Sequence, residues 1–223
     1  MPSFMLVLAL YAEGASDKRF LPILIQRTAE QILNQRGRFI VEVLPPRIIE
    51  KIEAPTQAEC ILKAAQQASG YHALIIHADA DHPTRNEAFE QRFQPGYTLV
   101  QQATPPVCKH LLPVIPVRMI EAWLLAHPEA LQEILDTTMN AAALGLPLKA
   151  REVESVPSPK QTLKQAVQKA RAHLPRRRQN IDIGSLYEPI ARLISLERLD
   201  EVPAYKQFKA DLTKVLGSLN LIE

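Results

Sequence analysis

Four short, nearly continuous apolar runs fall within the first 117 residues, and stretches with helical patterning separate them. The runs are FMLVLALY (4–11), RFIVEVL (38–44), HALIIHA (72–78) and HLLPVIPV (110–117). A strand that is buried on both faces lacks the polar alternation of a half-exposed strand. Strands that alternate with helices build a parallel sheet covered on both faces. The pattern therefore predicts an α/β fold with a four-stranded parallel sheet flanked by helices.

Apolar residues at helical spacing predict the remaining elements. Helices are expected over 16–34, 56–69 and 87–94, over 118–135 with a break at Pro128, and over 160–173, 186–194 and 202–219. The composition changes after these first four helices, because 138–159 is irregular and 160–173 is rich in Lys and Gln. We therefore expect an α/β core over 1–136 and a helical, basic C-terminal extension over 137–223 that packs on the core.

Several classes of protein are excluded by what the sequence lacks. Its 223 residues include only seven glycines, and neither a GxxxxGK[ST] nor a GxGxxG string occurs, which excludes nucleotide chemistry that depends on such phosphate loops. The two cysteines, Cys60 and Cys108, form no CxxC pair and exclude a disulfide scaffold or a Cys-rich zinc site. No apolar run approaches the ~20 residues that span a bilayer. We expect a cytoplasmic protein without a membrane partner.

Three acidic side chains follow two of the predicted strands. Glu13 comes after the first strand, and Asp79 and Asp81 come after the third in HADADH (77–82). Ligands of parallel α/β sheets bind at the carboxyl ends of the strands, and residues two apart in an extended chain project to the same side. Carboxylates that lie close together repel each other unless a positive charge separates them. If the two strands are neighbours, we expect these three carboxylates to share a divalent cation, Mg²⁺ or Mn²⁺.

The acidic motif has a second interpretation that needs no metal. Asp79 and Asp81 can cap the turn that follows, where aspartate is common and Pro83 is a natural break. Either flanking histidine can be a ligand of a softer metal, although His77 lies within the apolar run, as a core histidine does, and His82 stands just past the pair. We favour the Mg²⁺ interpretation because an apolar strand precedes the pair and a second acidic motif ends another strand.

A fourth carboxylate lies in an apolar helical segment. Glu121 is part of PVRMIEAWLLA (116–126), in which the neighbouring residues leave no polar face for it. A buried carboxylate needs a counter-charge or a cation. Arg118 can supply the counter-charge as an ordinary i,i+3 pair, and its guanidinium can also face a phosphate. Both residues join the three carboxylates above as candidate catalytic residues.

Basic residues are concentrated in one segment of a chain whose formal net charge is only +2. Residues 149–178 hold nine Lys and Arg against two Glu. The candidate contacts to a nucleic-acid backbone are Lys160, Lys164, Arg176, Arg177 and Arg178. The alternative is a solvated helix face followed by a basic loop. No aromatic residue is interleaved, so base stacking is not indicated, and binding here would depend on backbone charge.

These motifs together resemble known proteins. A glutamate after the first strand and a DxD motif after the third are similar to the Toprim domain of topoisomerases, primases and nucleases of the overcoming-lysogenization-defect class. More closely, the resemblance is to the Toprim-related bacterial family called domain of unknown function 4276. It is carried by YAEGASDKRFL (11–21), HADADH (77–82), PVRMIEAWLLA (116–126), PKQTL (159–163) and PAYKQFKADL (203–212), so it spans nearly the whole chain.

The resemblance implies roles for particular residues. Glu13 matches the Toprim glutamate that acts as general acid/base, and Asp79 and Asp81 match the aspartates that bind Mg²⁺. Glu121 and Arg118 match the smaller family's own motif and have no assured Toprim role. Function in that family is inferred from proximity to ATPases in mobile-element or phage-defence settings. Strand passage and priming are unsupported, because no attached ATPase and no tyrosine nucleophile in a topoisomerase context accompany the motifs.

We therefore expect a Mg²⁺-dependent phosphodiester hydrolase, a nuclease of phage defence or mobile elements that contacts the nucleic-acid backbone. The alternative is a non-catalytic Toprim-like effector or regulatory subunit that binds a nucleotide or a partner ATPase of the ABC or AAA type. A DxD phosphatase or glycosyltransferase fits less well. Such phosphatases place a nucleophilic aspartate after the first strand, where this chain has Glu13.

Overall fold

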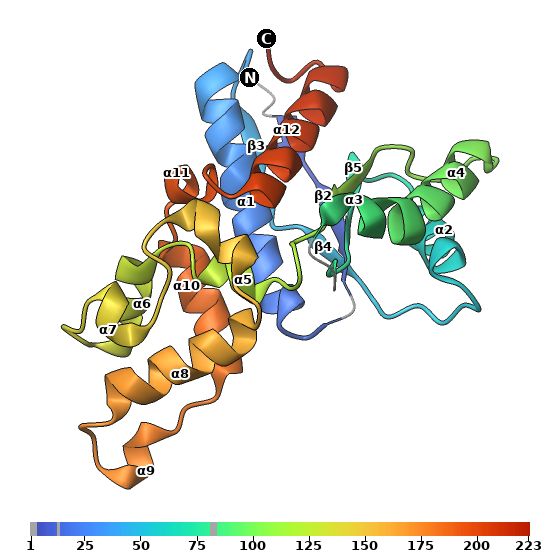
Figure 1. The fold of residues 1–223 in the computed structure, drawn as a ribbon. Helices are drawn as coiled ribbons and strands as arrows, with labels where there is room; N and C mark the ends of the chain where they lie inside the picture. Colours follow the sequence, from blue (N-terminus) through green and yellow to red (C-terminus); the bar gives the residue numbers. More distant parts are fainter. Residues whose placement is uncertain (1–3, 13, 81–83) are drawn as a thin grey trace.

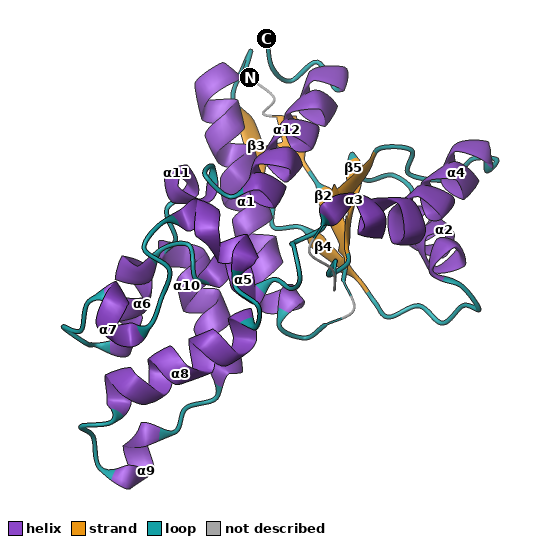
Figure 2. Cartoon of the chain, viewed as in Figure 1, coloured by secondary structure: helices purple, strands orange, loops and turns teal. Residues whose placement is uncertain are grey.

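The sheet is built from short strands whose pairings are all parallel. The structure, a computed structural model, describes residues 4–12, 14–80 and 84–223. Its strands are β1 (Phe4–Leu6), β2 (Leu8–Tyr11), β3 (Val41–Val43), β4 (Arg47–Ile49), β5 (Ala73–His77) and β6 (Leu111–Val114). The four-stranded sheet has the order β4-β2-β5-β6, and β1 pairs with β3. The predicted α/β fold with a four-stranded parallel sheet flanked by helices is confirmed (Figures 1 and 2).

The first predicted strand is divided in two, and the second is shorter than predicted. The first run is interrupted at Val7 and gives β1 and β2, and the second run becomes extended only at Val41. Pro45 and Pro46 then separate β3 from β4, a strand that the sequence analysis did not predict. Proline cannot donate to a strand ladder, so a proline pair confines this edge of the sheet to two short strands.

Helices connect the strands and form most of the C-terminal half. The longer ones are α1 (Asp17–Arg36), α2 (Gln57–Gln67), α4 (Gln94–Gln102), α6 (Pro128–Leu135), α8 (Pro159–Arg171), α10 (Tyr187–Leu193) and α12 (Pro203–Ser218). The shorter ones are α3 (Arg85–Ala88), η1 (Phe89–Phe93), α5 (Glu121–Leu124), α7 (Ala141–Leu144), η2 (Ala150–Ser155), α9 (Arg176–Gln179), η3 (Ile183–Leu186) and α11 (Leu196–Leu199). No helix in the described ranges has the length and apolarity that crossing a bilayer requires.

Different helices cover the two faces of the sheet. Leu10 and Ile75 belong to one buried cluster with residues of α1, whereas Leu74 and Ile76 belong to a second cluster with residues of α2 and α4. Figure 1 shows α1 and α2 on opposite sides of the strands. Because side chains alternate along a strand, a sheet covered on both faces needs apolar residues at every position. This packing explains the continuous apolar runs.

The C-terminal helices share the first cluster with the sheet. Trp123 of α5 is fully buried, and its ring meets the Tyr205 ring of α12 edge-on with 5.6 Å between centroids. The Tyr205 hydroxyl lies 2.9 Å from Thr28 Oγ1 of α1. Glu154 accepts a hydrogen bond from Ala204 N and so caps the first turn of α12. The division of the chain into a core and an extension stays a prediction.

Two helical glycines provide a matched test of the packing between α2 and α4. A Cβ at Gly96 would lie 2.6 Å from Ile61 Cδ1, whereas a Cβ at Gly217 in α12 would meet nothing within 4 Å. We predict that Gly96→Ala lowers the free energy of unfolding by about 1–3 kcal/mol, because it overpacks this contact. Gly217→Ala should raise it by up to about 1 kcal/mol, because alanine favours a helix. Urea unfolding measures both changes, and wild-type stability of Gly96→Ala contradicts the packing described.

Candidate functional site

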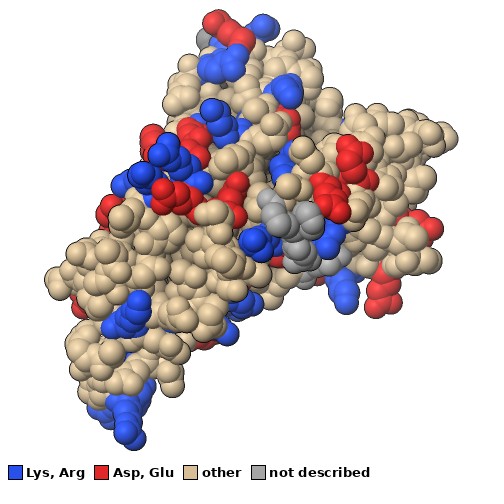
Figure 3. All heavy atoms as spheres, viewed as in Figure 1, with Lys and Arg blue, Asp and Glu red and all other residues tan. Residues whose placement is uncertain are grey.

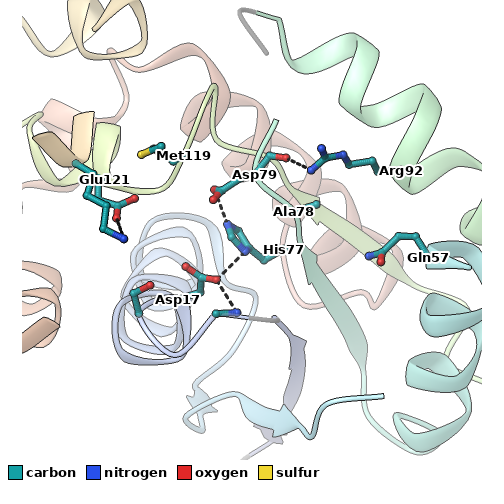
Figure 4. A pocket seen from close by; sticks show the side chains of 11 residues that line it. Asp17, Gln57, His77, Ala78, Asp79, Arg92, Met119 and Glu121 are labelled. Atoms are coloured by element: carbon teal, nitrogen blue, oxygen red, sulfur yellow. Dashed lines mark hydrogen bonds and ion pairs between the residues drawn. The ribbon is translucent and has the colours of Figure 1, made fainter. Parts of the chain in front are cut away.

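A pocket of about 590 Å³ opens at the carboxyl end of β5. This is the edge of a parallel sheet at which ligands of α/β proteins bind. The residues that line it include Asp17, His77, Asp79, Glu121 and Lys160. Figure 4 shows Asp17, His77 and Asp79 in one row, with Glu121 on another wall of the pocket. The pocket therefore brings together carboxylates from three separate segments of the chain.

A buried histidine lies between two aspartates. His77 Nδ1 is 3.3 Å from Asp17 Oδ2, and His77 Nε2 is 3.4 Å from Asp79 Oδ1. The side chain of His77 is 4% exposed, that of Asp17 10% and that of Asp79 32%. His77 in the middle of the row is therefore the most buried of the three, and Asp79 is the most accessible.

The extended chain after β5 explains why His77 and Asp79 lie side by side in this row. Ala78 N still donates to the carbonyl oxygen of Val114, the last residue of β6, and Ala80 N donates to that of Pro116 just beyond it. The chain thus stays extended as far as Asp79, and residues two apart face the same side. Because Ile75 faces α1, His77 and Asp79 also face the helix that carries Asp17.

The first turn of α1 supplies the third member of the row, Asp17. Gly14 N donates a hydrogen bond of 3.0 Å to Asp17 Oδ2. A side chain at Gly14 would overlap the Asp17 carboxylate, so this contact requires a glycine. Ser16, the residue at the N-cap of α1, forms no side-chain cap hydrogen bond. Gly14 therefore has a structural role, which is to place Asp17 against His77.

His77, the middle residue of the row, is positively charged at neutral pH. Burial alone would lower the pKa of His77, but its contacts with Asp17 and Asp79 outweigh burial and raise the pKa to about 9. For the Asp17 carboxyl, burial alone would raise the pKa. Its contacts with His77 and the Gly14 N–H, and the charge of Lys160, instead bring that pKa below its usual value. A protonated imidazole has no lone pair for a metal. His77 is therefore a counter-charge to the two aspartates.

The segment after β6 fixes Asp79 in place. Arg118 has a φ of 64°, and beyond this turn Ile120 N donates to Asp79 Oδ1 at 3.0 Å. On the other side, Arg92 Nη1 donates to the Asp79 carbonyl oxygen at 2.7 Å. A non-glycine residue in the left-handed region costs about 1–3 kcal/mol and is often found at functional sites. The backbone and side chain of Asp79 are both held without any ligand.

Arg118 does not form the expected ion pair with Glu121. The helix α5 begins at Glu121, so Arg118 precedes the helix and the i,i+3 spacing does not apply. Within the described part of the chain, Arg118 Nε is buried without a hydrogen-bond partner. Arg118 is also not one of the described residues that line the pocket. Its catalytic role stays a prediction.

Glu121 has other partners. Glu121 Oε1 accepts a hydrogen bond of 2.6 Å from the Tyr187 hydroxyl and lies 3.6 Å from Lys160 Nζ. The Glu121 side chain is 5% exposed, so its expected burial is confirmed. Burial and the Glu121 carboxylate raise the pKa of Tyr187 well above its usual value, so the phenol stays protonated and donates. Three distant segments, α5, α8 and α10, meet at this carboxylate.

Two of the predicted metal ligands, Glu13 and Asp81, lie outside the described residues, as does His82. In the ranges that the structure describes, no group of three His, Cys, Asp or Glu side chains could hold a metal ion. Asp17 is bonded to His77, which leaves Asp79 as the accessible oxygen donor of the row. A hard cation fits this pocket only if Glu13 and Asp81 complete its ligands, and their role stays a prediction.

The residues predicted to contact nucleic acid are spread along the arm of the molecule that α8 and α9 form. Lys160 lies at the start of α8 and lines the pocket, and Lys164 is exposed one turn later. Arg176, Arg177 and Arg178 lie in α9, at the far tip of the arm (Figure 1), where Figure 3 shows a group of basic side chains. Whether these residues bind nucleic acid stays a prediction.

Sequence reasoning did not identify Asp17 or Tyr187, and it treated His77 as a core residue. Because aspartate is common in the first turn of a helix, the position of Asp17 gave no signal of a functional role. The spacing of two between His77 and Asp79 was the one available signal for the histidine. Tyr187 lies in no motif, and only the packing of α10 against α5 and α8 brings it to Glu121.

The elevated pKa of His77 predicts a pH-dependent stability of the metal-free protein. The folded-state pKa is about 9 against an ordinary value of 6.5, so the stabilisation is complete below the ordinary value and is lost as the pH rises through the folded one. Its size is on the order of 3 kcal/mol. Histidine NMR in the presence of a chelator should give a midpoint near 9 for a resonance that disappears in His77→Gln. An ordinary midpoint for that resonance contradicts the contacts of His77 with Asp17 and Asp79.

Comparisons with known proteins place the chain in a family. Residues 12–213 match the family model described as Domain of unknown function (DUF4276). The matched range includes every residue of the site described above, from Asp17 to Tyr187. No curated protein and no solved structure matched the chain. The match covers most of the sequence, and the chain therefore belongs to the DUF4276 family.

Proposed function

We propose that this chain is a metal-dependent phosphodiester hydrolase, a nuclease with a Toprim-like site. The observation that carries the proposal is the position of Asp79, an accessible carboxylate fixed at the end of a central strand. The pocket in front of it also holds Glu121, Lys160 and Arg92. Phosphodiester cleavage requires acidic groups that hold a cation or move protons, and basic groups that offset phosphate charge. This pocket offers both kinds of group.

The proposed cofactor is Mg²⁺, with Mn²⁺ as an alternative, and the proposed ligands are Asp79, Glu13 and Asp81. One or two carboxylates with retained waters are typical of Mg²⁺ in proteins. When bound, such a cation offsets phosphate charge and lowers the pKa of a coordinated water. The strand order favours this ligand set, because β2, which precedes Glu13, pairs directly with β5, which precedes Asp79. The same arrangement is the basis of the proposed relation to Toprim nucleases.

The remaining residues have distinct proposed roles. Glu13 acts as the general acid/base. Glu121, held by the Tyr187 hydroxyl, orients the ammonium group of Lys160 at the pocket, where this cation offsets the charge of the phosphate. Arg118 is proposed as a second cation for the phosphate, although it is not one of the described residues that line the pocket. Lys164 and the arginines of α9 contact the nucleic-acid backbone farther along the arm. The proposed setting is the cytoplasm, in phage defence or mobile elements.

A cleavage assay tests the proposal. Purified protein is incubated with plasmid or short single strands in Mg²⁺, Mn²⁺ or chelator, and the rate of strand cleavage is measured. We predict metal-dependent cleavage that Asp79→Asn slows by about 10²-fold or more, because the fixed carboxylate is lost. The matched control is Asp136→Asn, which removes an exposed carboxylate at a left-handed position outside the described pocket linings. Equal rates for Asp79→Asn and the wild type would refute the role of Asp79.

The Tyr187 hydroxyl provides an independent test of the proposed role of Glu121. Tyr187→Phe keeps the buried ring and removes the donor to Glu121. We predict a loss of about 1–3 kcal/mol in the free energy of unfolding, because a buried carboxylate oxygen loses its partner. The cleavage rate should also fall, while the protein stays folded by circular dichroism. Unchanged stability and rate would show that the hydroxyl does not hold Glu121.

The alternative is a non-catalytic subunit, which one observation favours. Asp17 and Glu121 are already bonded to groups of the protein itself, as acids in a site without a cation would be. If no metal supports cleavage, the chain instead acts through a partner ATPase or a bound nucleotide. Co-purification with an ATPase, and activity that arises only in that complex, distinguishes this alternative from the nuclease.

A further inference from the structure

We infer that the substrate of this site is a single nucleic-acid strand, whose backbone passes from the pocket at Asp79 into a trough along α8. The inference rests on the proposed function and adds the kind of substrate and its path. The trough is a second pocket of about 580 Å³. It shares Ser16 and Lys160 with the first pocket, so the two form one continuous depression.

The walls of the trough differ in character. Lys160, Lys164 and Gln168 line it from α8, and the segment 179–184 lines it from the opposite side. Residues four apart lie on the same face of a helix, about 6 Å apart along its axis. The two lysines and the glutamine therefore form a row of hydrogen-bond donors that begins at the first pocket and leads away from it.

The donors of the trough are available for a ligand. Within the described ranges, the side chains of Lys164, Gln168 and Asn180 form no hydrogen bond or ion pair. By contrast, Lys169 and Arg171 of the same helix face away and donate to backbone carbonyl oxygens. The uncommitted donors thus lie on the face of α8 that borders the trough, where they can bind phosphate oxygens.

The charge of the trough is positive despite one acidic residue. Asp182 lines it, but its Oδ1 accepts a hydrogen bond from Gly184 N in its own turn. Val167, Ile181 and Ile183 provide apolar surface beside the donors. A lining of cationic and amide donors with apolar patches fits a nucleotide, which has a charged backbone and an apolar base face.

The size of the trough favours one strand over two. Pockets of roughly 300–1,000 Å³ hold molecules of drug size, and the trough lies within that range at about 580 Å³. It therefore accommodates one or two nucleotides, and a duplex would lie outside it. Gln179 at its edge directly follows Arg176, Arg177 and Arg178, so the basic tip of α9 lies where an emerging strand would pass.

Binding in chelator separates this inference from the proposed chemistry, because no cleavage is needed for the readout. Fluorescence anisotropy measures the Kd of labelled oligothymidylate and oligouridylate, with a duplex of the same length as competitor. We expect both single strands to bind at least tenfold more tightly than the duplex. Lys164→Glu should raise their Kd about tenfold and reduce the slope of log Kd against log salt by about 1.

The control is Lys206→Glu, which reverses an exposed lysine of α12 outside the described pocket linings. It should leave the Kd within twofold of the wild type. Equal or tighter binding of the duplex overturns the inference, and so does wild-type affinity in Lys164→Glu or the absence of oligonucleotide binding by the wild type. If the binding assay overturns this inference, the protein can still cleave nucleic acid in the presence of a metal. If the cleavage assay fails, the preference for single strands in chelator can still be measured. The two failures are therefore distinguishable.

Discussion

The site depends on a buried imidazolium that holds two carboxylates at the end of β5. Without a positive charge, Asp17 and Asp79 would repel each other in a poorly solvated region, and their burial would be costly. His77 lies within 3.4 Å of both and supplies that charge. The contact also joins the first turn of α1 to the central strand. Gly14 is part of the same arrangement, because its N–H reaches the carboxylate that faces His77.

The C-terminal helices complete the pocket. Tyr187 and Lys160 reach Glu121 from α10 and α8, so a carboxylate of α5 is held by groups from the last third of the chain. The same helices pack on α1 and the sheet through a continuous apolar cluster. Packing of these helices therefore positions charged groups at the site as well as burying apolar area. A change at the α8 or α10 contact should alter the site without touching Asp79.

The sheet could be predicted because burial on both faces leaves a pattern in single runs of sequence. β4 was missed because Pro45 and Pro46 separate it from the run that predicted β3. The burial of Glu121 was predicted from its apolar neighbours, but its partner was not, because Arg118 turns the chain with a positive φ before α5 begins. Periodicity describes neighbours along one element and contains no information on contacts such as that between Tyr187 and Glu121.

We propose that Asp79 shares a divalent cation with Glu13 and Asp81 at the carboxyl edge of the sheet. A crystal structure with Mn²⁺, located by its anomalous scattering, would test this proposal. We expect a peak coordinated by the Asp79 carboxylate, with Glu13 and Asp81 among the remaining ligands and His77 behind Asp79. Crystals that retain the contacts of His77 but show no peak, or in which the Glu13 carboxylate points away from Asp79, would contradict it.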